Sequence, residues 1–227
     1  LIKDIWGRIF ISSPETTDVI HHPIQSTDDF VHYHFPPPKN FFWDNIARWK
    51  EQSPFFTACQ IDIGFSMMVE LIGFERLVFS LKDERSKLFT FIKNFHDFAS
   101  EMVDMAIEKG ADCTWLADDF AHNLGTFISP KDLLETDFQY IDLLTKRAHR
   151  RGLPVNLHAC GRITDVIDSL ISTGIDSLMG IQPAAGNNIY ELHSKYHNHL
   201  TFIGNLDLNE LLTFGSLLEV NLLVKEL

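Results

Sequence analysis

The sequence predicts an α/β protein of the (β/α)8-barrel (TIM-barrel) type, because a unit of helix, glycine and strand recurs along the chain. Three stretches show this unit: "EKGADCTWLADD", "RRGLPVNLHACG" and "STGIDSLMGIQP". In each, the glycine suits the left-handed position just past a helix, and the apolar run after it has strand propensity. Residues 55–60 and 200–207 add further strands, and the helices between strands are long enough for parallel crossovers.

The distribution of polar residues favours a barrel over a doubly wound open sheet. No glycine-rich phosphate loop follows a predicted strand. Polar side chains gather instead at the C-terminal ends of several strands, where barrel enzymes carry their active sites. Only five or six of the eight strands can be found before Leu227, so we expect an incomplete barrel whose C-terminal strands are missing from this chain.

Two helices and a domain boundary can also be predicted. Residues 84–109 carry apolar side chains at intervals of three and four, the pattern of a helix packed on a sheet. A second helix, residues 129–152, opens with a capping serine followed by proline. Residues 1–50 are rich in proline, aromatic residues and histidine without a sustained period. We expect them to form an irregular segment packed on a barrel made by residues 51–227.

Composition limits the class of protein and its partners. Hydrophobic residues make up 45% of the 227 residues, as in ordinary globular proteins. The formal net charge of −12 repels phosphate backbones and anionic membranes, so we expect neither nucleic acid nor a membrane as partner. No apolar run reaches the roughly 18 residues needed to cross a bilayer, and the start lacks the layout of a signal peptide. The prediction is a cytoplasmic protein that acts on a small molecule.

The stretch "VNLHACGR" is a candidate for half of a metal site. In an extended strand Asn156, His158 and Cys160 share one face, which would point to the barrel axis while the apolar residues between them face helices. An imidazole and a thiol at adjacent inward positions suit zinc, which binds nitrogen and thiolate sulfur tetrahedrally. The alternative stays open that His158 hydrogen-bonds a neighbour and Cys160 is only a small buried side chain.

A zinc site normally needs at least three protein ligands, and the sequence does not identify the third. The three cysteines are too few and too scattered for a disulfide framework. Cys59 lies near a predicted strand end and could supply the ligand, whereas Cys113 begins its strand and should lie at the opposite face. The histidines of the N-terminal segment are interpreted as surface or packing residues: His21, His22, His32 and His34.

Polar residues at other strand ends are candidates for catalysis and substrate binding. Asp118 and Asp119 follow the strand that begins at residue 113, and either could act as a general base, bind substrate or orient a metal ligand. Gln182 and Asp207 end two further strands and, with Asn156, are expected to bind substrate. Arg162 is expected to contact an anionic group. Asp118, Asp119, Gln182 and Asp207 could each instead serve only as a turn residue.

Taken together, the motifs resemble those of the uroporphyrinogen decarboxylase (URO-D) superfamily. The order of aspartate pair, Ser-Pro, His-x-Cys-Gly, Ile-Gln-Pro and Gly-x-x-Asp carries the resemblance, from about Phe55 to Leu212. It implies a (β/α)8 barrel. One branch of the superfamily decarboxylates a tetrapyrrole in porphyrin biosynthesis without a metal, using an arginine-rich N-terminal motif that is not visible here. That branch does not normally carry His-x-Cys-Gly.

The other branch is similar to corrinoid-dependent methyltransferases, which bind zinc through a His-x-Cys pair and a distant second cysteine. His158 and Cys160 match the first two ligands. The resemblance implies that zinc binds a thiol substrate, which attacks a methyl group on a corrinoid carried by a partner protein. A zinc-dependent methyltransferase is therefore the leading hypothesis. The alternatives are uroporphyrinogen decarboxylase activity and a non-catalytic barrel that binds a corrinoid or another small ligand.

Overall fold

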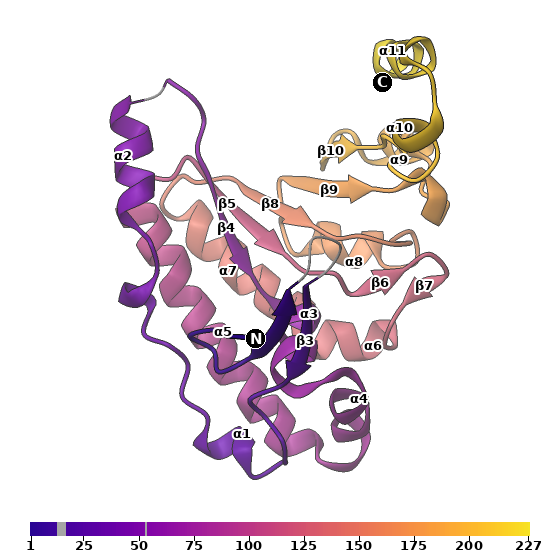
Figure 1. Ribbon diagram of the computed structural model, residues 1–227. Helices are drawn as coiled ribbons and strands as arrows, with labels where there is room; N and C mark the ends of the chain where they lie inside the picture. Colours follow the sequence, from indigo (N-terminus) through magenta and orange to yellow (C-terminus); the bar gives the residue numbers. More distant parts are fainter. Residues whose placement is uncertain (13–16, 53) are drawn as a thin grey trace. The chain divides into compact units, whose positions relative to one another are not determined.

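The computed structural model describes residues 1–12, 17–52 and 54–227 (Figure 1). The chain divides into two compact units, residues 1–114 and 115–227, and each is described by itself. The boundary at residue 50 stays a prediction, since this division separates compact bodies and does not test it. Among the described helices, none combines the length and the hydropathy required to cross a membrane.

The first unit opens with a small antiparallel sheet. Its strands are β1 (Ile2–Lys3), β2 (Ile9–Ser12) and β3 (Thr17–His21), in the order β1-β2-β3. The expectation of an irregular segment was wrong for this part, because strands of two to five residues are too short to produce a visible period in the sequence. The elements that follow are α1 (Asp29–His32), a 3₁₀ turn (Pro38–Asn40) and α2 (Asp44–Gln52).

Aromatic contacts hold the N-terminal segment against the long helix of this unit. The remaining elements are β4 (Ala58–Asp62), α3 (Gly64–Ile72), α4 (Phe74–Asp83) and α5 (Arg85–Glu108), and α5 confirms the helix predicted over 84–109. The ring centroids of Trp6 and Phe98 lie 5.2 Å apart, and those of Phe35 and Phe91 lie 5.4 Å apart. Such pairs stabilise the fold beyond the area they bury. The aromatic composition of the segment therefore serves packing.

The second unit alternates strands with helices. The strands are β5 (Cys113–Ala117), which crosses the division, β8 (Val155–His158), β9 (Ser177–Ile181) and β10 (Thr201–Gly204), with the neighbour order β10-β9-β8-β5. β9 pairs in parallel with both β8 and β10 (Figure 1). A short hairpin of β6 (Ala121–His122) and β7 (Gly125–Thr126) follows β5. This alternation is the predicted α/β arrangement.

Helices connect these strands. They are α6 (Pro130–Leu133), α7 (Gln139–His149), α8 (Ile167–Ser172), α9 (Ile189–Tyr196), α10 (Leu211–Phe214) and α11 (Leu217–Glu226), with a 3₁₀ turn at Pro183–Ala185. The predicted N-cap is confirmed, since the hydroxyl of Ser129 accepts a hydrogen bond from the backbone N–H of Asp132 at 3.1 Å. A π-helical turn, Leu134–Phe138, interrupts the helix predicted over 129–152. Helical periodicity alone does not reveal one extra residue in a turn.

The π-helical turn places a carboxyl group in the core of the second unit. Asp137 is only 1% exposed, and burial raises its pKa well above the ordinary value, with the charge of Asp118 adding to the effect. The folded protein therefore keeps a proton on this group at a pH where the unfolded chain has lost it. Such a group stabilises the fold fully at acidic pH, and the contribution is lost as the pH rises through the folded pKa.

Replacing Asp137 by asparagine is expected to make the fold more stable at neutral pH. The amide never ionises, so the free energy of unfolding of the variant should exceed that of the wild type increasingly as the pH rises. The difference should grow by about 1.4 kcal/mol per pH unit while only the folded wild type holds the proton. Urea denaturation at several values between pH 4 and 8 measures it. Asp165→Asn is the control, because the Asp165 side chain is 55% exposed. The prediction would be contradicted if the free energy of unfolding changed with pH in the same way in the wild type and in Asp137→Asn.

Candidate metal centre

The end of β8 positions the histidine and the cysteine singled out in the sequence. The apolar residues Val155, Leu157 and Ala159 are at most 1% exposed. His158 and Cys160 alternate with them and are only partly buried. The sequence predicted that Cys160 would lie within the strand. β8 ends at His158, however, so Cys160 lies in the loop that follows. The two side chains nevertheless come together, with Cys160 Sγ 3.4 Å from His158 Nε2.

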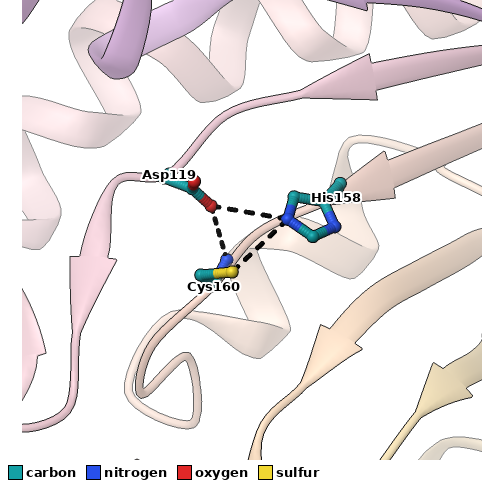
Figure 2. Close-up of side chains that lie close together, drawn as sticks. All are labelled: Asp119, His158 and Cys160. Carbon is teal, nitrogen blue, oxygen red and sulfur yellow. Dashed lines mark hydrogen bonds and ion pairs between the residues drawn. The ribbon is translucent and has the colours of Figure 1, made fainter. Parts of the chain in front are cut away.

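A third group, the carboxylate of Asp119, completes the arrangement (Figure 2). Asp119 Oδ1 lies 3.6 Å from His158 Nε2 and accepts a hydrogen bond of 2.8 Å from the backbone N–H of Cys160. One ligand atom from each residue lies within 4.8 Å of the others. Sequence reasoning assigned Asp119 to catalysis, to substrate binding or to orienting a metal ligand, and missed it as a direct third ligand beside His158 and Cys160. The available signal was its place after β5, since β5 and β8 are neighbours in the sheet.

The three atoms fit the requirements of a tetrahedral zinc ion. Zinc binds imidazole nitrogen, thiolate sulfur and carboxylate oxygen, and catalytic sites use three protein ligands with one position open. With bonds of about 2.0–2.3 Å, ligand atoms around a tetrahedral ion are separated by about 3.4–3.6 Å. The measured separations from His158 Nε2 are 3.4 Å to the sulfur and 3.6 Å to the carboxylate oxygen. The donor types and the two separations from His158 Nε2 are therefore compatible with zinc.

Burial and a neighbouring carboxylate determine the protonation state of Cys160. Burial, the negative charge of Asp119 and a hydrogen bond to its carboxylate together raise the pKa of the Cys160 thiol to about 11. At neutral pH the side chain is therefore a protonated thiol, which is a poor nucleophile. A divalent cation at the point where the three atoms meet would reverse this, because a coordinating thiol loses its proton.

The geometry argues against a metal-free cysteine nucleophile of the Cys-His-Asp kind. In such a triad the histidine contacts the nucleophile through one ring nitrogen and the carboxylate through the other. Here Cys160 Sγ and Asp119 Oδ1 both approach Nε2 of His158. The other nitrogen, Nδ1, is buried and has no hydrogen-bond partner in the described part of the chain. Three groups that converge on one point suit metal coordination better than a proton relay.

The chain matches a family model over most of its length: the model for uroporphyrinogen decarboxylase (URO-D) covers residues 16–227. This protein belongs to the uroporphyrinogen decarboxylase family. The family fold is a (β/α)8 barrel, which confirms the predicted fold class. A search of curated protein sequences found no match.

A solved structure with a TM-score above 0.5 agrees with the family fold. A methyltransferase from Methanosarcina mazei superposes with a TM-score of 0.68 at 15% sequence identity, over 88% of this chain and 60% of that one. The URO-D chain thus spans three fifths of the length of that enzyme. A structure described as IolI protein with a binding zinc atom gives a TM-score of 0.43 at 12% identity, over 79% of this chain and 60% of that one. At 15% identity the likeness to the methyltransferase concerns the fold alone.

Glycines let the loop of this URO-D chain approach its neighbours. Gly161 has φ +83°, and a Cβ there would lie 2.5 Å from the backbone carbon of Ala121. Gly180 of β9 lies under the imidazole, since a Cβ on it would be 3.3 Å from Cε1 of His158. Gln182 accepts a 2.7 Å hydrogen bond from the N–H of Gly161. Asn187, which sequence reasoning missed, donates to the Gly161 carbonyl at 2.8 Å. These contacts hold the peptide that follows Cys160.

A cavity of about 270 Å³ opens beside His158 and Cys160. Side chains that line it are His158, Cys160, Met179, Gln182, Leu206, Asp207 and Leu208. The cavity thus includes Gln182 and Asp207, two of the residues predicted to bind substrate. Asp207 also caps a turn, as its Oδ1 accepts from the N–H groups of Asn209 and Glu210 at 2.8 and 3.0 Å. No lysine or arginine occurs among the described residues that line this cavity.

The structure does not bring four of the predicted site residues to the cavity lining, and one of them, Asp119, belongs instead to the three-residue group. Asp118 is 1% exposed and lies in the interior, so the two adjacent aspartates have different surroundings. Asn156 does point inward, but its Oδ1 accepts a hydrogen bond from Ser177 at 2.9 Å. The Arg162 guanidinium lies 3.4 Å from Asp165 on the surface. The hydrogen bond of Asn156 and the ion pair of Arg162 give these two side chains a structural role that requires no substrate.

Replacing Asp119 by asparagine is expected to weaken zinc binding by about 10–100-fold, because the amide oxygen carries no charge to offset that of the metal. Competition against a chromophoric chelator measures the affinity. Asp165→Asn removes a carboxylate of similar exposure outside the group and should leave the affinity unchanged. Equal affinities for wild type and Asp119→Asn would exclude Asp119 as a ligand.

Proposed function

We propose that this URO-D family protein is a zinc-dependent methyltransferase that moves a methyl group from a corrinoid carried by a partner protein to a small thiol. The observation that carries the proposal is the convergence of Asp119 Oδ1, His158 Nε2 and Cys160 Sγ at one point. The fold shared with a methyltransferase from Methanosarcina mazei supports the reaction class.

Asp119, His158 and Cys160 would hold the metal through one oxygen, one nitrogen and one sulfur. Bound zinc supplies a Lewis acid that lowers the pKa of a substrate thiol to near neutral pH. The chain's own residues do the rest of the positioning. The Gln182 side chain accepts a hydrogen bond from the backbone N–H of Gly161, and the Asn187 side chain donates one to its backbone carbonyl, so the adjoining Cys160 keeps its orientation. The buried β8 residues Val155 and Leu157, which precede His158 in the strand, anchor its backbone in the core.

The cavity beside Cys160 suggests which thiols are accepted. Its volume of about 270 Å³ is below the range of about 300–1,000 Å³ that is typical of drug-sized ligands. Asp207 contributes a negative charge, and the described lining contains no cationic side chain to offset it. A small thiol without a negative charge therefore fits better than an anionic one. A tetrapyrrole with many carboxylates fits poorly for the same reasons.

The reaction can be tested with methylcobalamin as donor and 2-mercaptoethanol as acceptor. The thiolate sulfur attacks the methyl carbon, a C–S bond forms, and the pair of electrons of the Co–C bond stays on cobalt as cob(I)alamin. Absorbance follows the cobalamin, and mass spectrometry follows the thioether. The full-length zinc-loaded protein should catalyse the transfer, with 3-mercaptopropionate a slower acceptor. Cys160→Ala should be inactive, and Cys59→Ala, which removes a half-buried thiol in the first unit, should remain active.

Three outcomes would overturn the proposal. Metal-free wild type that is as active as the zinc-loaded protein would exclude a zinc mechanism. Decarboxylation of uroporphyrinogen at equal rates by wild type and Cys160→Ala would favour the second candidate, to which the family name points. Binding of cobalamin without turnover under any of these conditions would favour a non-catalytic ligand-binding barrel.

Zinc affinity is expected to rise with pH. Because the pKa of Cys160 is about 11, zinc must displace one proton from the thiol at any pH below that value. The apparent association constant should therefore increase about tenfold per pH unit between pH 7 and 9. Chelator competition at fixed ionic strength provides the measurement. A pH-independent affinity would show that the Cys160 thiol does not bind the metal.

A further inference from the structure

A second cavity, of about 640 Å³, lies in the first unit and shares no residue with the candidate metal centre. It is formed where the segment after β3 meets the junction of α3 and α4. His22 lines it from the first of these, and Gly73 lies between the two helices. Side chains of α4 complete the wall. Its volume is in the range of small-molecule sites.

The hydrogen bond of His22 determines what its ring offers to this cavity. Nδ1 lies 2.8 Å from the backbone oxygen of Glu70, and since a carbonyl only accepts, Nδ1 carries the proton. Burial lowers the pKa of His22, and the nearby charge of Arg76 lowers it further, so the ring is neutral at pH 7. Nε2 is then a hydrogen-bond acceptor. Gly73, with φ +88°, makes room for it, because a Cβ there would lie 3.3 Å from Nε2.

The other lining groups are mostly acceptors and aromatic faces. Glu75, Asp83 and Glu84 contribute carboxylates. The single cationic group is Arg76, whose Nη1 donates to backbone carbonyls, one of them that of Ile24 at 2.8 Å. The rings of two further lining residues remain largely exposed, 46% for Phe74 and 65% for Phe79. Exposed aromatic faces attract cations.

We propose that this cavity binds a small organic cation, with an ammonium group facing the carboxylates and His22 and an apolar body against Phe74 and Phe79. An anion would meet three carboxylates, of which that of Glu84 is paired with Lys87 at 3.5 Å, and one guanidinium already engaged with the backbone. A metal ion would need three ligand atoms close together. Within the described ranges, only Asp119, His158 and Cys160 form such a group.

The test uses 2-phenylethylammonium chloride as probe and isothermal titration calorimetry on the full-length protein. Saturable binding is expected, at least tenfold tighter than that of the neutral isostere 2-phenylethanol. The double change Glu75→Gln with Asp83→Asn should weaken binding of the ammonium at least tenfold and leave the alcohol unchanged. His22→Asn should also weaken it, because asparagine can still donate to Glu70 but has no group in the place of Nε2.

Asp97→Asn is the control, since Asp97 is an exposed carboxylate of α5 outside the cavity. It should bind the ammonium like the wild type. Absence of saturable binding, equal affinity for the ammonium and the alcohol, or tighter binding of 3-phenylpropionate would each overturn the proposal. Zinc content and methyl transfer are measured separately, so failure of this proposal leaves the proposed function standing, and the reverse is also true.

Discussion

Cys160→Ala is expected to lower the zinc affinity of this protein by about a thousandfold or more, equivalent to about 4 kcal/mol of binding free energy. The variant loses the thiolate, which is the softest of the three donors and the one with the largest share of negative charge to give to the metal. His158 and Asp119 would then be the remaining members of the group. Two ligands are too few for a zinc site that survives purification.

Elemental analysis of the purified proteins and chelator competition measure the loss. A cobalt-substituted sample adds a spectroscopic readout, because a thiolate ligand produces a charge-transfer band that a histidine or carboxylate ligand does not. The band should be present in wild type and in Cys59→Ala and absent in Cys160→Ala. One equivalent of tightly bound zinc in Cys160→Ala would show that the metal binds at another place in the protein.

Gly161→Ala is expected to destabilise the fold by about 3 kcal/mol or more. Its φ of +83° disfavours any side chain, and the new Cβ would lie 2.5 Å from the backbone carbon of Ala121 and 2.6 Å from the backbone nitrogen of His122. Backbone atoms cannot rotate away as a flexible side chain can. The loop after Cys160 would therefore have to move, and zinc affinity should fall together with stability.

Gly152→Ala separates the cost of the left-handed backbone conformation from the cost of the steric contact with Ala121. Gly152 also has a left-handed φ, of +77°, but a Cβ there would meet nothing within 4 Å. It should cost only about 1–2 kcal/mol, the penalty of the left-handed conformation for a residue with a side chain. Urea denaturation of both variants provides the comparison. Equal losses of stability would mean that the close approach to Ala121 does not matter.

Much of the fold could be predicted because it depends on residues that are near each other in the chain. The helix over 84–109 follows from the spacing of its apolar residues, and the N-cap at Ser129 follows from the capping chemistry of one turn. β8 shows its two faces through the alternation of apolar and polar residues. The small strands of residues 2–21 and the π-helical turn at 134–138 were missed, because neither extends far enough to leave a period.

The sequence by itself determined the strand that carries His158 and leads into Cys160, and it placed both side chains on one side of the chain, since alternation is a local property of extended backbone. It also marked Asp118 and Asp119 as the end of a neighbouring strand. Only the tertiary structure decided between those two. Asp119 Oδ1 meets the N–H of Cys160 across 41 positions of sequence, while Asp118 is buried. Adjacent residues of an extended chain point to opposite sides, and which side faces the histidine depends on how β5 lies beside β8, which no local pattern encodes.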